Sequence, residues 1–96
     1  MNIKELLETF KDSPADRTLA RNLLVEAKVT YVPEKILGGY ITLEDDSSKL
    51  EAVTIKKNIL EDLKALIKIE KKSKFKGRLD KTEFGNIAFE IEEILE

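Results

Sequence analysis

The chain has 96 residues, of which 42% are hydrophobic and 38% are charged, and its formal net charge is −2 at pH 7. This length allows a single domain, residues 1–96, with one core. The absence of cysteine and histidine excludes disulfides, Cys/His zinc sites and catalysis by a cysteine nucleophile or a histidine base. No apolar run approaches the roughly 18–20 residues that span a bilayer, and no secretory signal pattern is present. We therefore expect a cytoplasmic protein without membrane contact.

Two helices are predicted in the first part of the chain. Residues 2–11 have the i, i+3, i+4, i+7 spacing of an amphipathic helix, with Asn2 and Glu5 placed as a capping box. Ser13 and Pro14 suit the start of a second helix, which we expect to end near residue 27. The apolar side chains expected to face inward from these two helices are Ile3, Leu6, Leu7, Phe10, Leu19, Ala20, Leu23 and Leu24.

A β-hairpin is predicted next. Residues 28–32 and 40–45 are rich in β-branched and aromatic residues, with Pro33 and the Gly38-Gly39 pair between them as turn residues. Two strands alone are marginally stable in water, so one face of the hairpin must pack on helices.

Residues 48–72 are predicted to form a long core-facing helix, because apolar residues fall on one broad face when they are plotted at 100° per residue. The β-branched run at 53–55 leaves an alternative, in which residues 50–56 form a third strand and Asn58 caps a shorter helix.

A last helix is predicted from Asp80 to the C-terminus, with Glu83 completing a capping box. Its apolar residues fall on one face, which is expected to point inward: Phe84, Ile87, Ala88, Ile91, Ile94 and Leu95. In the alternative, residues 87–91 form a strand with Ile87, Phe89 and Ile91 on one face. The predicted fold class is α+β and mainly helical, in the order ααββαα.

The first candidate functional feature is a basic cluster. Residues 64–81 carry eight basic side chains against two acidic ones, a net charge of +6. Basic side chains neutralise phosphates, and an interleaved aromatic can stack on a base. The candidate nucleic-acid contacts are Lys71, Lys72, Lys74, Phe75, Lys76 and Arg78. The competing interpretation is a solvated helix end, with lysines favourable to the negative end of the helix dipole.

The segment from Arg17 to Val32, followed by residues 38–43, resembles the recognition helix and wing of a winged-helix module. The resemblance covers roughly 30 residues and implies that Arg17 and Arg21 face DNA. Residues 1–47, however, carry 6 basic and 9 acidic side chains, and this net charge of −3 opposes DNA binding.

The third candidate feature is exposed apolar surface. On the predicted last helix, Phe89 points away from the apolar stripe, between Gly85 and Glu93, as an interface anchor would. This placement predicts a homodimer around a two-fold axis. Ile36 and Leu37, at the tip of the hairpin, form a second apolar pair.

The sequence gives little support for a catalytic, cofactor-binding or metal-binding site. Carboxylates occur together at Asp45-Asp46 and at Glu90, Glu92 and Glu93, but the spacing of a calcium loop, a phosphate-binding loop and a nucleophile turn is absent. We therefore expect no metal, cofactor or enzymatic activity. The predicted function is a small non-enzymatic protein-binding module, a regulator, inhibitor or adaptor. The alternative is a nucleic-acid-binding regulator that uses the winged-helix-like half or the lysine cluster.

Overall fold

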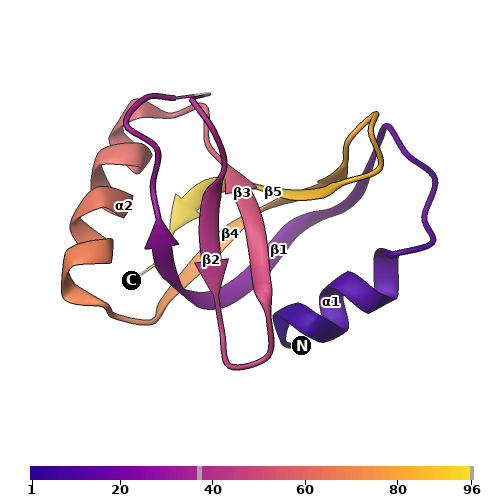
Figure 1. The fold of residues 1–96 in the computed structure, drawn as a ribbon, viewed down its shortest axis with the longest axis horizontal. Helices are drawn as coiled ribbons and strands as arrows, with labels where there is room; N and C mark the ends of the chain where they lie inside the picture. The colour runs from indigo at the N-terminus through magenta and orange to yellow at the C-terminus, as the bar shows by residue number, and fades with distance from the viewer. Residues whose placement is uncertain (37, 96) are drawn as a thin grey trace.

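The computed structural model describes residues 1–36 and 38–95, and within them it contains two helices and five strands. The elements in chain order are α1 (Ile3–Phe10), β1 (Arg17–Tyr31), β2 (Ile41–Glu44), β3 (Lys49–Val53), α2 (Lys57–Ile69), β4 (Ser73–Lys81) and β5 (Ile87–Ile94). The prediction of a mainly helical ααββαα chain is therefore wrong. Figure 1 shows the strands wrapped around one another in the centre, with α2 and α1 on opposite sides of them.

The strands close into a barrel in the order β1-β2-β3-β5-β4, with β4 pairing back to β1. All pairs are antiparallel except β3 and β5, where Ala52 lies beside Phe89. The long β1 pairs with two neighbours in the barrel: its C-terminal end pairs with β2, and most of its length pairs with β4. A five-stranded Greek-key barrel with a helix between the third and fourth strands is the architecture of the OB-fold.

Strand β1 replaces the predicted second helix, and its bulges explain the misleading spacing. The register with β4 shifts between Thr18 and Ala20 and again between Ala20 and Leu23, and Asn22 between them has a left-handed φ of 54°. A bulge inserts an extra residue and bends the strand. Ala20 and Leu23, which are three positions apart in β1, therefore both pair with β4, although this spacing is also that of neighbours on one face of a helix. Leu24, which was predicted to face inward, is 61% exposed.

The stretch predicted as one long helix is a strand followed by a helix, so the alternative with a third strand is the correct one. The hydroxyl of Thr54, just after β3, donates to the Ile91 carbonyl at 3.1 Å and accepts from the Lys56 N–H at 3.2 Å, which ends the strand and turns the chain. Lys56, rather than Asn58, occupies the N-cap of α2 and provides no side-chain cap. The inward face of α2 consists of Ile59, Leu60 and Leu63.

The predicted last helix is wrong, and its residues belong to the β4–β5 hairpin. Phe89 and Ile91 alternate into the core, as the strand alternative for this stretch predicted, and Phe75 of β4 is fully buried with them. Gly77 is required at the centre of β4, because a Cβ there would collide with the carbonyl oxygen of Glu90 on β5.

Helix α1 is confirmed with its capping box. The Glu5 N–H donates to the Asn2 side chain at 2.9 Å, and the Asn2 N–H donates to the Glu5 carboxylate at 3.2 Å. Ile3 and Leu6 are buried against the barrel. Within residues 1–36 and 38–95, neither helix is long and apolar enough to cross a membrane.

Candidate binding surface

The structure separates the residues predicted to form a protein interface. Phe89 is fully buried in the core, so the homodimer predicted around an exposed Phe89 has no basis in the folded chain. Gly85 lies in the β4–β5 turn with φ +85°, and Glu93 is exposed on β5. Ile36 packs partly against the core, and Leu37 lies outside the described residues.

The predicted basic cluster is also divided by the fold. Phe75 points into the barrel and is fully buried, so it cannot stack on a nucleic-acid base. Arg78, on the outer face of β4, donates to the Asp80 carboxylate from Nε at 3.0 Å and to Glu90 from a terminal nitrogen at 3.2 Å. These partners, the Asp80 hydrogen bond first, raise the pKa of Arg78 above its ordinary value. Its charge is thus neutralised within the protein.

The other basic candidates remain on the surface, but Phe75, the aromatic predicted to stack beside them, is in the core. Lys71 and Lys72 connect α2 to β4, and Lys74 and Lys76 alternate with buried residues along β4. The winged-helix resemblance is wrong, because the segment that carries Arg17 and Arg21 is strand β1 and no recognition helix exists there.

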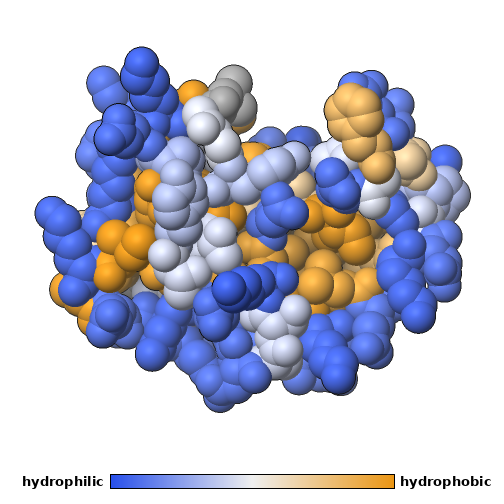
Figure 2. Space-filling model, in the orientation of Figure 1, coloured by the Kyte–Doolittle hydropathy of each residue, from blue (hydrophilic) through white to orange (hydrophobic). Residues whose placement is uncertain are grey.

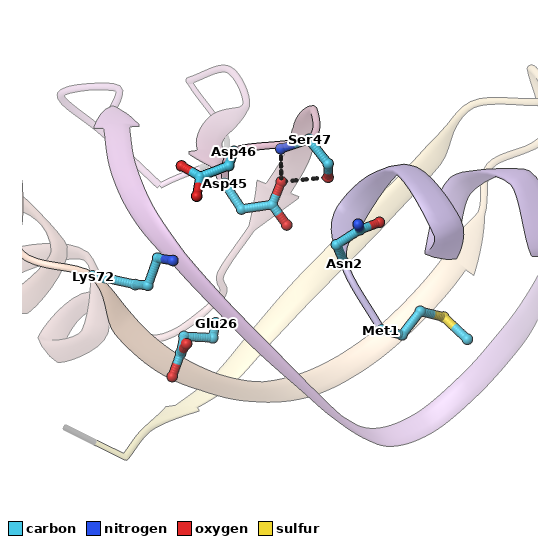
Figure 3. Close-up of a pocket in the computed structure, with 7 residues that line it drawn as sticks. All are labelled: Met1, Asn2, Glu26, Asp45, Asp46, Ser47 and Lys72. Carbon is cyan, nitrogen blue, oxygen red and sulfur yellow. Dashed lines mark hydrogen bonds between the residues drawn. The ribbon is translucent and has the colours of Figure 1, made fainter.

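A pocket of about 450 Å³ lies where the β2–β3 turn meets α1 and β1 (Figure 3). Its lining residues are Met1, Asn2, Glu26, Asp45, Asp46, Ser47 and Lys72. Three of them are carboxylates, yet no group of three or more His, Cys, Asp or Glu side chains is arranged to hold a metal within the described part of the chain.

Both carboxylate oxygens of Asp45 in this pocket accept hydrogen bonds from the protein itself. One carboxylate oxygen accepts from the N–H of Ile3 at 2.8 Å, and the other accepts from the N–H and hydroxyl of Ser47 and the N–H of Ser48. Partial burial of the carboxyl opposes its ionisation, but these hydrogen bonds outweigh that effect and lower the pKa of Asp45 to about 2. Asp45 therefore joins the β2–β3 turn to the start of α1.

A second depression, about 310 Å³, lies between α1, β3 and the β4–β5 turn, and we call it the α1 groove. Its lining residues are Leu7, Lys11, Lys49, Glu51, Lys81, Gly85, Asn86 and Ile87. Figure 2 shows a hollow with hydrophobic side chains at its base and hydrophilic ones around it in this part of the molecule. Leu7 and Ile87 are half-buried apolar residues of this groove that also pack on the core.

Lys81 fixes one wall of the α1 groove. Only 8% of this residue is exposed, and its Nζ donates to the carbonyl oxygens of Lys11 at 2.6 Å and Phe10 at 3.5 Å. Because these carbonyls lie at the C-terminal end of α1, where the helix dipole is negative, a buried cation is favourable there. Lys81 thereby attaches the end of α1 to β4.

Phe84 stands beside the groove on the β4–β5 turn and is 84% exposed. The turn is closed by hydrogen bonds from the Thr82 N–H to the Asn86 carbonyl at 2.8 Å and from the Gly85 N–H to the Thr82 carbonyl at 3.0 Å. The Thr82 hydroxyl also accepts from the Asn86 N–H at 3.1 Å. The surface therefore presents an aromatic ring on a turn with defined geometry.

The exposure of Phe84 contradicts the sequence-based prediction, in which Phe84 lies on the inward face of the last helix. The Gly85-Asn86 pair between two β-prone runs was the signal for a hairpin turn. The two aromatics thus exchange the places predicted for them, with Phe84 on the surface and Phe89 in the core.

A scan against protein-family models finds no match to this chain, and a search of curated proteins finds no significant relative.

Proposed function

We propose that this protein is a non-enzymatic protein-binding module, a regulator or adaptor that acts by occupying a partner's surface through Phe84 and the adjoining α1 groove. The observation that carries the proposal is the 84% exposure of Phe84 on a turn closed by backbone hydrogen bonds. Aromatic side chains supply a large share of the energy of protein interfaces, and a turn backbone that is already ordered loses little conformational entropy on binding.

The surroundings of Phe84 suit such a contact. Leu7 and Ile87 give the groove an apolar floor, while Lys11, Lys49 and Glu51 supply polar groups at its edge. This arrangement matches the apolar centre and polar rim of protein interfaces. OB-fold barrels bind oligonucleotides and oligosaccharides at the β2–β3 face and at loops that include the β4–β5 loop, so analogy of fold supports the location of the site but not the class of partner.

Site-specific photo-crosslinking tests this proposal. A photoreactive phenylalanine analogue at position 84, expressed in the native host, should give a discrete adduct with one protein partner. The matched control places the same analogue at position 69, because Ile69 is 62% exposed at the far end of α2. Equal adducts from both positions, or no adduct from position 84, would refute the proposal. Fractionation of the same cells tests the cytoplasmic location, which we also propose.

A nucleic-acid-binding regulator is the second candidate. Its support is the combination of an exposed aromatic with Lys11 and Lys49 beside a loop that contacts oligonucleotides in OB-fold barrels. Glu51 in the same groove and the net charge of −2 count against it. A gel shift with single-stranded nucleic acid decides between the two, because binding to phosphates weakens steeply with salt.

A further inference from the structure

Resting on the proposed function, we infer that the α1 groove takes an acidic segment of the partner protein that carries a bulky apolar side chain between its carboxylates. The charged residues that line the groove are mostly basic. They comprise Lys11, Lys49 and Lys81 against Glu51 alone, on a protein whose net charge is −2. The groove is therefore a locally positive part of an acidic protein.

These lysine charges lack a carboxylate partner in the folded chain. Within residues 1–36 and 38–95, no carboxylate lies within ion-pairing distance of Lys11, Lys49 or Lys81. The charge of Lys81 is satisfied by the carbonyls at the end of α1, whereas Lys11 and Lys49 are exposed residues of the groove. Lys11 and Lys49 are thus the two cations available to a partner, one on the helix side and one on the sheet side.

The apolar groups define the rest of the ligand. Leu7 and Ile87 lie in the same groove as these two lysines, and Phe84 is two residues from Asn86 at its edge. A volume of about 310 Å³ is at the lower limit of small-molecule sites, which suits a few side chains of a peptide. An aromatic or aliphatic side chain placed against Leu7 and Ile87 would bring flanking carboxylates toward the two lysines.

The remaining charges favour spaced carboxylates over a continuous polyanion. Glu51 lines the groove, and Glu83 precedes Phe84 in the turn beside it. A phosphate backbone would have to pass these acidic groups, whereas a peptide can place its own carboxylates where the lysines are. Complementary charge of this kind mainly sets partner selection and association rate.

The first experiment selects short random peptides displayed on phage against the intact protein. The parent should enrich peptides in which Asp or Glu flanks an aromatic or large aliphatic residue. The Lys11→Gln/Lys49→Gln double variant should lose this enrichment. The matched control, Lys57→Gln/Lys68→Gln, removes the same charge from exposed positions on α2 and should keep it.

Fluorescence anisotropy with the most enriched peptide then measures affinity. We expect the Lys11→Gln/Lys49→Gln variant to bind about three- to tenfold more weakly, as for two rim ion pairs, and replacement of the peptide's acids by their amides to do the same. Enrichment of basic or uncharged peptides, no enrichment, or equal losses in the control variant would overturn the inference. If a position-84 adduct persists in those cases, the proposed function stands and only the acidic partner is wrong.

Two further outcomes would assign the groove to another occupant and overturn the inference. One is concentration-dependent self-association in sedimentation that Lys11→Gln/Lys49→Gln abolishes, which would make a second copy the occupant. The other is tighter binding of a labelled single-stranded oligonucleotide than of the enriched peptide at physiological salt.

Discussion

Replacing Asp45 by asparagine tests the assignment of this carboxylate as the link between α1 and the β2–β3 turn. The substitution keeps the size of the side chain but removes its charge and one of two acceptor oxygens. Those oxygens accept hydrogen bonds from Ile3, Ser47 and Ser48. We therefore expect Asp45→Asn to loosen both the start of α1 and the turn.

The pKa of Asp45 sets the magnitude. It falls from 3.8 to about 2 in the folded protein, and each unit corresponds to roughly 1.4 kcal/mol. The upper limit is thus about 2.5 kcal/mol, and screening of a half-exposed group reduces the expected loss to about 1–2 kcal/mol at neutral pH.

The pH dependence has a defined sign. Because folding lowers the pKa of Asp45, its contribution is complete above the unfolded value of 3.8 and is lost as pH falls toward 2. Urea unfolding of the parent and Asp45→Asn should therefore differ most near pH 7, and the difference should shrink by about half near pH 3. Asp46→Asn, a change at the exposed neighbour in the same turn, serves as the control. A gap that stays constant with pH, or no gap at neutral pH, would refute the assignment.

Three other substitutions test the fold. Leu63→Ala should lower the free energy of unfolding by about 2–5 kcal/mol, because Leu63 is fully buried on the inward face of α2 and its truncation would leave a cavity. Urea unfolding measures this, and a loss below about 1 kcal/mol would contradict the burial. Gly77→Ala should cost about 3 kcal/mol or more, since the new methyl group collides with the Glu90 carbonyl; thermal unfolding near that of the parent would disprove this close approach. Lys81→Met should detach the end of α1 by removing the hydrogen bonds of Lys81 to the Phe10 and Lys11 carbonyls. Relative to the parent, amide hydrogen exchange should become faster in α1 but not in α2. Unchanged exchange in α1 would mean that Lys81 does not hold the helix.

The sequence by itself determined the elements whose signals are local. Asn2 and Glu5 form the predicted capping box, and α1 starts where they indicate. The apolar positions Ile59, Leu60 and Leu63 lie on the inward face of α2, as their helical spacing predicted. In both cases the interacting groups are within about one helical turn of each other, so spacing and cap chemistry suffice.

The barrel could not be predicted from local sequence patterns and is seen only in the tertiary structure. The register shifts between Thr18 and Ala20 and between Ala20 and Leu23 give β1 a spacing that imitates a helix, and the bend that they introduce lets the strand reach both β2 and β4. The periodicity of residues 84–95 also fitted a helix, but pairing with β4 and β3 makes most of this stretch a strand. Such pairing depends on partners far away in the chain, which no local pattern contains.

The candidate site depends on the same long-range strand pairing. A helix over residues 80–96 would bury Phe84 and expose Phe89, whereas the β4–β5 hairpin does the reverse, because side chains alternate along a strand and a turn lies between the two. Lys11, Lys49 and Lys81 are far apart in the sequence and meet at one groove only through barrel closure and the docking of α1. Composition supplied these charged and aromatic residues, and long-range strand pairing determined which of them share a surface.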